Sequence, residues 1–307
     1  MKRFVICLVA IGLIFSFNAC KKDGVYNPSK KVSKIYTEEY LYDSADNVIG
    51  SIPVLSENYT WDKNRLKELV RYKRGIQEEK QIFVYDGNRL VRIDHVDPEY
   101  PTDIMSQTIF SYEGSKLHKA TLLDWGYIEA EIEYIYDKNK ISEIVYTIYG
   151  AALDNILEPL KQVLDPNVVE VLKSDKEILA CMEAKNGLTH KAGVRTMKML
   201  LEWEKDNISQ ISMENNNFIY NASLTYDNKK NPFYSRPIEQ FTPEYADFFS
   251  FFCNKNNIVH VEVTYSIGLT ETLSIEYEYD GSYPVKQTIL PSNAGPDDVI
   301  IKHIEYR

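Results

Sequence analysis

The stretch Phe83-Val84-Tyr85-Asp86-Gly87-Asn88-Arg89-Leu90 carries the pattern that decides the fold. Phe83 and Tyr85 place two rings on one face of a strand, because successive side chains of a strand point to opposite faces. Asp86 and the Gly-Asn pair after it supply the chemistry of a short hairpin loop, which we expect to be built on a type I turn. Leu90 then returns the chain to the sheet. The stretch therefore predicts a β-hairpin.

Copies of this pattern recur along the chain, each with an aromatic residue, an acidic residue and a turn, usually followed by Leu or Ile. The other copies occupy residues 59–66, 110–117, 134–141, 201–208, 224–228 and 277–282, with a looser one at 40–49. The key aromatic residues of the first four copies are 24 to 27 residues apart, which is enough for two strands and two turns. The repeats therefore predict an up-and-down antiparallel meander. We expect their Tyr and Trp rings to pack across strands rather than to form a ligand-stacking platform.

Two insertions, at about 150–190 and 237–254, interrupt the repeat with helical patterns. The first contains a capping box formed by Ser174 and Glu177, and the second begins with Thr242-Pro243, a typical helix start. The second insertion also gathers aromatic residues that form either a candidate contact patch or a plug against a concave sheet: Tyr245, Phe248, Phe249, Phe251 and Phe252. The predicted fold is mainly β, a large curved antiparallel meander of repeated hairpins that can close partly into a barrel, with a small helical insertion.

The N-terminus has the features of an export signal. Lys2 and Arg3 precede an apolar run that is too short to span a bilayer, and the run ends at Ala19-Cys20. This junction resembles a bacterial lipobox, in which the Cys is acylated and becomes the first residue of the mature chain. We predict a signal peptide at 1–19, lipidated Cys20 and a tether at 20–34, and a single β-repeat domain at 35–307. The alternative is an ordinary signal peptide, with Cys20 incidental.

The composition is that of a folded globular protein, with 44% hydrophobic and 26% charged residues, and Tyr accounts for 23 of 307 positions. The chain carries 35 basic and 45 acidic residues, a net charge of -10, which argues against nucleic acid or an anionic membrane surface as the main partner. Cys181 and Cys253 remain in the body of the protein, and either a disulfide or two free thiols fits their positions. Their spacing matches no metal or redox motif.

The sequence contains no recognisable catalytic constellation. No metal-ligand spacing, phosphate-binding loop or nucleophile elbow occurs, so no catalytic residue, metal or cofactor is predicted. We interpret Asp94-His95, which comes before Pro98, as part of a solvated turn. Asp86, Asp137 and Asp280 recur with the repeat and are interpreted as turn residues. Asp43-Ser44-Ala45 resembles the O-glycosylation sequon of Bacteroides-group secreted proteins, which makes Ser44 a candidate modification site.

Two further stretches, Asp227-Asn228-Lys229-Lys230-Asn231-Pro232-Phe233-Tyr234 and Asn256-Asn257-Ile258, accompany the lipobox and the hairpins. With them, residues 35–307 resemble Bacteroides-group lipoproteins of unknown function that carry a porin-like domain. The resemblance implies a curved antiparallel sheet and brings no known activity, cofactor or catalytic residue. The hairpins are also similar to the Tyr-Asp repeats of bacterial wall-associated and toxin-shell proteins. We do not expect a membrane-spanning barrel, because charges such as Glu131, Glu133, Glu276 and Glu278 crowd one strand face.

These observations favour an outer-membrane lipoprotein with a noncatalytic binding or scaffolding role, facing the periplasm or the cell surface. Its acyl chains on Cys20 make the membrane one partner, and a glycan, a peptide or an outer-membrane protein is the candidate for another. One alternative is an envelope hydrolase with carboxylates on the concave sheet face. The other is a self-associating structural or adhesion component that pairs through a sheet edge.

Overall fold

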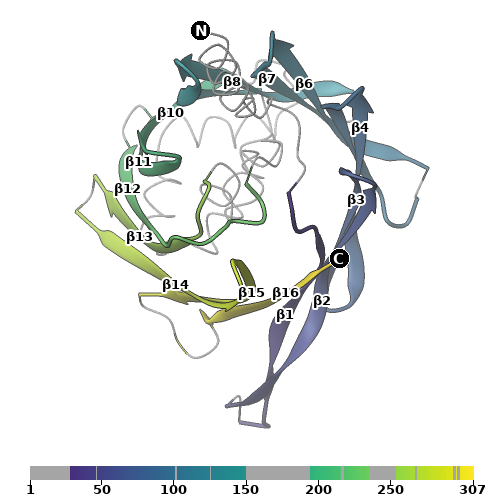
Figure 1. The fold of residues 1–307 in the computed structure, drawn as a ribbon, viewed down its shortest axis with the longest axis vertical. Helices are drawn as coiled ribbons and strands as arrows, with labels where there is room; N and C mark the ends of the chain where they lie inside the picture. Colours follow the sequence, from purple (N-terminus) through teal and green to yellow (C-terminus); the bar gives the residue numbers. More distant parts are fainter. Residues whose placement is uncertain are drawn as a thin grey trace, which may run out of the picture.

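Sixteen antiparallel strands follow one another around a single closed barrel, in which β1 pairs with β16 (Figure 1). The computed structural model describes residues 28–45, 47–100, 102–124, 126–149, 194–215, 218–234, 254–266, 268–292, 295 and 298–307. The strands are β1 Val32–Tyr42, β2 Val48–Asp62, β3 Arg65–Lys73, β4 Ile76–Asp86, β5 Arg89–Val96, β6 Ile104–Glu113, β7 Lys116–Asp124, β8 Tyr127–Asp137, β9 Lys140–Tyr149, β10 Val194–Glu204, β11 Asn207–Asn215, β12 Phe218–Tyr226, β13 Ile258–Tyr265, β14 Thr270–Asp280, β15 Tyr283–Pro291 and β16 Ile300–Tyr306. The predicted mainly β meander is confirmed, and it closes completely.

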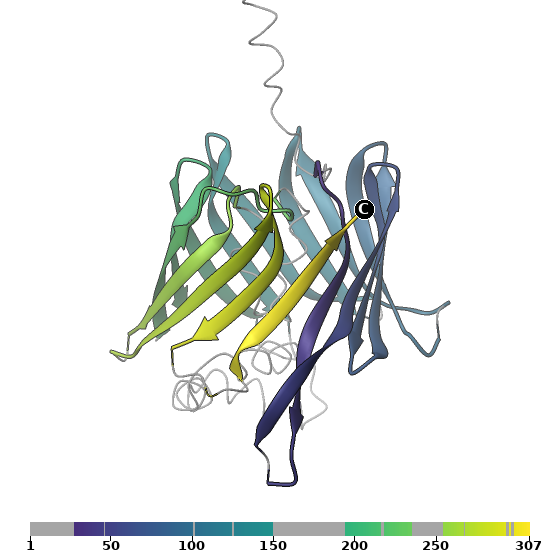
Figure 2. The same cartoon turned by 60° about the horizontal axis from the view of Figure 1, so that its bottom comes forward.

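The barrel has two different rims, which lie at opposite ends in Figure 2. The repeat rim carries the short turns after β2, β4, β6, β8, β10 and β14, together with residues 227–230, 254–257 and 28–31. Arg307 also lies there, and its backbone N–H donates to the carbonyl of Lys31 at 3.0 Å. The opposite rim carries the connections after β1, β3, β5, β7, β13 and β15, and the β1–β2 hairpin extends beyond it (Figure 2). The looser sequence copy at 40–49 turns at this opposite rim, out of step with the others.

The core lies on the inner face of the barrel. In β4 and β5, Phe83 pairs with Ile93, and both are buried, while the intervening Val84 and Arg92 pair on the other face. Fully buried side chains recur in this register around the ring, among them Leu66, Leu90, Ile132, Ile144 and Ile208. Because a closed barrel can enclose only its inner side, this register identifies the inward-pointing positions. In the copies that turn at the repeat rim, the aromatic residues therefore point inward, as the alternation predicts, and two of these copies have Leu201 or Leu224 in place of the first ring.

Neighbouring hairpins are joined by the polar tips of their aromatic side chains. The Tyr85 hydroxyl donates to the carbonyl of Leu66 at 2.9 Å, and the Tyr112 hydroxyl donates to that of Leu90 at 2.7 Å. The same contact is made by Trp61 to Val32, Trp203 to Ile141 and Tyr226 to Ile208. Each ring thus contacts the apolar residue that follows the previous turn. The rings also pack in the same core cluster as the Leu and Ile side chains, which confirms that the repeated aromatic residues are packing groups.

The backbone of the short turns differs from the type I prediction. In the six short turns of the repeat rim, two residues separate the last strand pair, and the first of them has a positive φ, for example Lys63 at 52° and Gly87 at 56°. A type I turn has negative φ at both central positions. A positive φ at the first central position occurs in the mirror-image turns, types I′ and II′, whose twist matches that of the two strands of a hairpin. The sequence identified the acidic residue before each turn and the presence of a turn residue that tolerates a positive φ. It did not identify the class of the turn.

Buried Asn side chains join segments 227–234 and 254–257 on the repeat rim. Asn254, which is 0% exposed, accepts a hydrogen bond from the backbone N–H of Ile208 at 2.8 Å. Asn231 donates to the carbonyl of Asn254 at 2.9 Å, and Asn257 donates through its backbone to Asp227 Oδ1 at 3.1 Å. Asp227, Asn231 and Asn257, which belong to the two stretches that carry the resemblance, therefore form with Asn254 a clasp between two chain segments and the adjacent strand.

Several predictions fall on residues outside those that the structure describes. They concern the signal peptide, Cys20, Cys181, Cys253 and almost all of the helical insertions at 150–190 and 237–254. Within the described part, β1 already begins at Val32, inside the segment predicted as tether. No helix among the described residues is long and apolar enough to cross a membrane.

Candidate functional site

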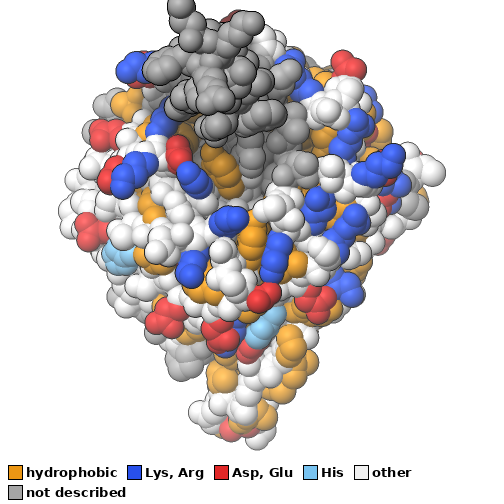
Figure 3. Space-filling view, in the orientation of Figure 1, with side chains coloured by type: hydrophobic (Ala, Val, Ile, Leu, Met, Phe, Trp, Pro, Cys, Tyr) orange, Lys and Arg blue, Asp and Glu red, His pale blue; other side chains and the backbone are white. Residues whose placement is uncertain are grey.

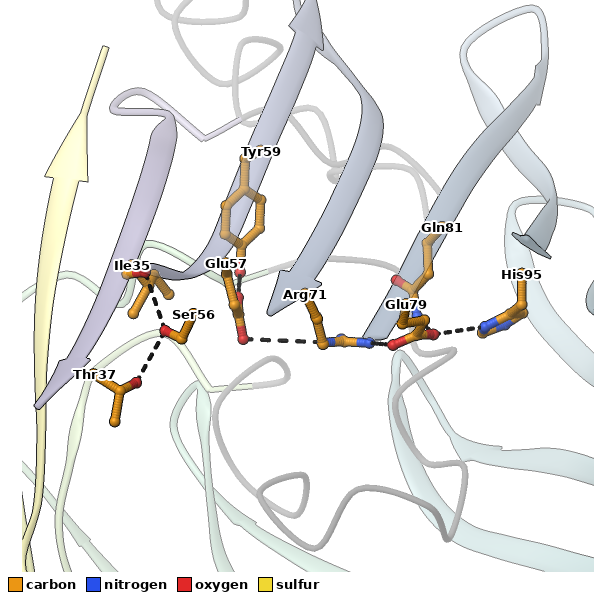
Figure 4. Close-up of polar contacts among 9 residues, drawn as sticks. All are labelled: Ile35, Thr37, Ser56, Glu57, Tyr59, Arg71, Glu79, Gln81 and His95. Atoms are coloured by element: carbon orange, nitrogen blue, oxygen red, sulfur yellow. Dashed lines mark hydrogen bonds and ion pairs between the residues drawn. The ribbon is translucent and has the colours of Figure 1, made fainter. Parts of the chain in front are cut away.

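A polar network lies on the inner wall of the barrel across β2, β3, β4 and β5 (Figure 4). Strand register places its members side by side. Glu57 pairs with Arg71, Arg71 pairs with Glu79, and Gln81 pairs with His95. All five positions share the inward register of Phe83 and its neighbours in the core. These side chains therefore replace the apolar core at one place on the wall.

Electrostatic contacts connect the network. Arg71 forms an ion pair with Glu79, and its Nε lies 4.0 Å from Glu57 Oε1. His95 Nδ1 lies 2.8 Å from Glu79 Oε1, which also accepts a hydrogen bond from Gln81 Nε2 at 2.8 Å. The side chains of Arg71, Glu79 and His95 are 13 to 18% exposed, so their charges are only partly screened by solvent. The guanidinium of Arg71 thus lies beside the carboxylates of both Glu57 and Glu79. His95 contacts Glu79 as well and would carry a second positive charge if it were protonated.

Gln81 is the most buried member, with 2% of its surface exposed. Its Nε2 is committed to Glu79, which fixes the orientation of the amide. Its Oε1 is buried and has no hydrogen-bond partner among the described residues. A hydroxyl or ammonium group is the chemistry that matches an acceptor in this position, because a buried acceptor without a donor costs about 1–3 kcal/mol.

The sequence did not identify this network, and one interpretation near it was wrong. Asp94-His95 is not a solvated turn, because both residues lie within β5 and Asp94 is only 5% exposed. They point to opposite faces, His95 inward to Glu79 and Asp94 outward to Arg92 Nε at 2.7 Å. Glu57 and Arg71 were missed as well. The available signal was strand alternation, which puts polar residues such as Glu79 and Gln81 in the inward register of Phe83.

The outer wall is charged along much of its circumference. Glu131, Glu133, Glu276 and Glu278 all lie in the outward register, as the alternation of their strands requires. Glu131 Oε1 lies 2.5 Å from Lys119 Nζ, and this hydrogen bond lowers the pKa of the carboxyl below its usual value. Further ion pairs on this wall join Lys198 to Glu143 at 3.2 Å and Lys286 to Glu278 at 3.0 Å.

Exposed large apolar side chains gather at the opposite rim. Among the described residues, ten of the thirteen such side chains lie there or on the β1–β2 hairpin that extends from it, and none lies on the repeat rim. Tyr127 and Ile76, with 80% and 72% exposure, are the most exposed. The others at this rim are Leu41, Tyr42, Ile49, Ile52, Tyr100, Ile104, Ile128 and Ile300. We call these ten residues the apolar rim patch.

Only one of the site residues predicted from the sequence can be placed. Ser44 is exposed in the turn of the β1–β2 hairpin, where Asp43 Oδ1 accepts hydrogen bonds from the backbone N–H groups of Ala45 at 2.8 Å and Asn47 at 2.9 Å. Cys20 and the predicted contact patch lie outside the described residues; the patch consists of Tyr245, Phe248, Phe249, Phe251 and Phe252. Within the described residues, no group of three or more His, Cys, Asp or Glu side chains is arranged to hold a metal ion.

Comparison with solved structures found one that superposes over most of this chain and others that align with lower scores. A porin-like protein from Bacteroides uniformis superposes with a TM-score of 0.50 at 10% identity, covering 93% of this chain and 100% of that one. A porin-like protein from Bacteroides vulgatus aligns at 10% identity over 91% of this chain and 99% of that one, with a TM-score of 0.27. A chain of the TcdB2–TccC3–Cdc42 complex aligns at 10% identity over 86% of this chain and 16% of that one, with a TM-score of 0.28. No protein-family model and no curated protein matches the sequence. The first superposition shows that the chain has a fold similar to that of a Bacteroides porin-like protein.

Proposed function

We propose that this protein is a lipid-anchored, noncatalytic binding protein of the cell envelope whose apolar rim patch contacts a protein partner. The observation that carries the proposal is the unequal distribution of exposed apolar side chains between the two rims. Scattered exposed apolar residues are normal on any surface, whereas a concentration on one face marks an interaction site.

The chemistry of the patch favours a protein over a glycan. Seven of its ten side chains are Leu or Ile, which supply apolar contact area without the aromatic faces or hydrogen-bonding groups that fix small polar ligands. The connections that carry the patch contain more acidic than basic residues: Asp43, Asp97, Glu99, Asp103 and Asp124 lie there, against Lys73 and Arg74. A complementary partner surface has an apolar centre bordered by Lys or Arg, because opposite charges at the rim of an interface favour the correct encounter. A second copy meeting patch to patch is disfavoured by like charges.

The sequence and the wall of the barrel support the placement in the envelope. The lipobox-like junction at Ala19-Cys20 makes Cys20 the proposed lipid anchor, and the outer membrane is the proposed location, on its periplasmic face or at the cell surface. The outward ion pairs, such as the one between Lys119 and Glu131, are unlike the apolar outer band of a spanning barrel. We therefore propose that the acyl chains, rather than the strands, hold the protein to the membrane.

The experiment compares two sets of substitutions in the native, anchored protein. Ile76→Ser, Tyr127→Ser and Ile128→Ser together remove part of the apolar rim patch, whereas Ile135→Ser and Leu200→Ser remove exposed apolar side chains from the outer wall. Chemical cross-linking in cells, followed by binding measurements with the purified captured protein, should show roughly tenfold or greater weakening for the rim variant only. Equal binding by wild type and rim variant, or self-association as the sole product by light scattering, would contradict the proposal.

The inner-wall network favours a second candidate, an envelope hydrolase that uses carboxylates on the concave face. Glu57 and Glu79 are carboxylates of this kind, and Gln81 Oε1 offers an acceptor beside them. A panel of envelope glycans and peptides incubated with wild type and with Glu79→Gln tests this candidate. Turnover that disappears in the variant supports it, and turnover that is equal in both, or that is absent from wild type, rejects it.

A further inference from the structure

The two rims carry charge of opposite sign, although the chain as a whole is acidic. The described residues of the repeat rim include thirteen Lys or Arg and eight Asp or Glu, counted over 28–31, 62–65, 86–89, 113–116, 137–140, 204–207, 227–230, 254–257, 280–283 and 307. The described connections of the opposite rim include two basic and six acidic residues, counted over 43–47, 73–76, 97–103, 124–127, 266–269 and 292–298. Figure 3 looks onto the repeat rim and shows Lys and Arg side chains spread around it. The charge distribution therefore distinguishes one end of the barrel as basic.

Three lysines on this rim occupy backbone positions that favour glycine. Lys63, Lys138 and Lys205 are exposed at the first turn position, with φ of 52°, 57° and 55°. Gly87 and Gly114 occupy the same position in neighbouring turns. A side chain in this region of φ is strained by its Cβ, so backbone energetics alone would select Gly. None of the three lysines forms an ion pair with another described residue. Ion pairs among the described residues therefore do not explain why these positions are Lys.

A second row of cations is held in place by the aromatic side chains of the repeat. Arg65 lies over the ring of Tyr85, with 5.7 Å between the guanidinium carbon and the ring centroid. The same contact is made by Arg89 over Tyr112 at 4.5 Å, Lys116 over Tyr136 at 4.8 Å and Lys140 over Trp203 at 5.2 Å. These contacts fix the cations in a row along successive turns. The charges are distributed along an arc and do not converge on one point, a layout that matches a planar array of anionic groups.

The chain enters the barrel at this same rim. Lys30 Nζ pairs with Asp280 Oδ2 at 2.8 Å, in the turn between β14 and β15. Pro28 lies eight positions after Cys20, so the two residues can be at most about 29 Å apart. An acyl group on Cys20 would therefore keep the basic rim close to the lipid surface. The argument from the anchor rests on the proposed function. The excess of basic residues on the repeat rim and the positive φ of its lysines are independent of that proposal.

We propose that the repeat rim docks on anionic phospholipid headgroups, so that the barrel stands on the membrane with its apolar rim patch directed away from it. Basic residues close to an anionic leaflet are attracted to it within about one Debye length. The lipid anchor supplies attachment, and the basic rim supplies orientation. The lysines with positive φ are the residues whose presence this role explains.

The test uses the mature chain, residues 20–307, with Cys20→Ser, so that attachment by acyl chains is removed. Sedimentation with vesicles compares phosphatidylcholine alone with phosphatidylcholine that contains phosphatidylglycerol. We expect binding only to the anionic vesicles, with loss of binding as the salt concentration rises. Lys63→Gly, Lys138→Gly and Lys205→Gly together should weaken this binding about tenfold or more. These substitutions suit the backbone, so the triple variant should fold, which thermal unfolding verifies.

Arg74→Gly is the matched control, because Arg74 has a φ of 51° but lies in a turn of the opposite rim. It should leave vesicle binding unchanged. Equal binding to both kinds of vesicle, no binding to either, or equal binding by wild type and the triple variant would overturn the proposal. Competition by inorganic phosphate beyond that of chloride at matched ionic strength would indicate a discrete phosphate site and would overturn it as well. Neither the lipid anchor nor a protein partner is present in this assay. A negative result would therefore contradict the docking of the repeat rim without contradicting the proposed function.

Discussion

The hydroxyl of Tyr85 donates a hydrogen bond to the carbonyl of Leu66, across the boundary between two consecutive hairpins. Tyr85 lies near the end of β4, just before the turn of its repeat. Leu66 lies near the start of β3, just after the turn of the preceding repeat. The contact therefore connects the two most recognisable positions of the sequence pattern. Its recurrence between successive repeats explains how a short motif builds a barrel, since each copy supplies both the donor for one neighbour and the acceptor for the next.

Removal of one such donor should have a moderate and local effect. Tyr85→Phe keeps the ring in the core but leaves the Leu66 carbonyl without this donor, which should lower the free energy of unfolding by about 1 kcal/mol. Denaturant-induced unfolding measures the change. Tyr127→Phe is the control, because Tyr127 is 80% exposed at the opposite rim and its hydroxyl should contribute little. Equal effects of the two substitutions would show that the hydrogen bond from Tyr85 to Leu66 does not specifically stabilise the fold.

The positive-φ turn positions should respond in opposite directions to substitution. Gly87→Ala should lower the free energy of unfolding by about 1 kcal/mol, because Ala is strained at the φ of 56° that Gly87 adopts. Lys63→Gly should raise it or leave it unchanged, because strain at 52° is relieved. The two thermal unfolding midpoints, measured against wild type, check this directly. A clear loss of stability in Lys63→Gly would mean that the lysine makes a stabilising contact.

The Asn clasp should be one of the most sensitive polar features of the barrel. Asn254→Ala leaves the buried N–H of Ile208 without its acceptor and should cost about 1–3 kcal/mol. Asn228→Ala, in the exposed part of the neighbouring segment, should change the free energy of unfolding far less. Urea denaturation of both variants gives the comparison. Similar values for the two would argue that the clasp is incidental to the fold.

The seam that closes the barrel should depend on pH. Glu38 on β1 accepts hydrogen bonds from Ser51 and from His303 Nε2 on β16, the latter at 2.8 Å, and these bonds lower its pKa below the ordinary value of 4.5. A carboxyl with a lowered folded-state pKa stabilises the fold above its unfolded-state pKa, and this contribution is lost as the pH falls through the folded-state pKa. The protection factors of amides in β1 and β16, which are corrected for the intrinsic exchange rate at each pH, should therefore fall below about pH 4.5, and Glu38→Gln should reduce this fall. Identical acid profiles for wild type and variant would contradict this assignment.

The repeated hairpins could be predicted from local sequence because each copy contains its own strand alternation and turn chemistry. Phe83, Tyr85 and Leu90 suffice to assign one hairpin and to orient its inner face. Complete closure could not be deduced in the same way, because it depends on the pairing of β1 with β16 at opposite ends of the chain. The turn class was missed because an acidic residue followed by Lys-Asn fits more than one backbone conformation.

The inner-wall network illustrates why the candidate site was harder to predict than the fold. Glu57, Arg71 and Glu79 are ordinary surface residue types and are separated along the chain. Only the strand register brings them together on the inside. The basic rim was hidden because the net charge of -10 is summed over the whole chain and does not show the excess of basic residues at one end. In both cases the feature depends on how the strands are arranged in space rather than on a contiguous motif.

The central claim, that the barrel stands on the membrane by one rim and meets a partner with the other, is tested most directly by site-specific photocrosslinking in intact cells. A photoreactive residue replaces Lys138 on the repeat rim or Tyr127 in the apolar rim patch, each in the anchored protein. The account predicts lipid adducts from position 138 and a discrete protein adduct from position 127. Lipid adducts from position 127, or the same products from both positions, would contradict it.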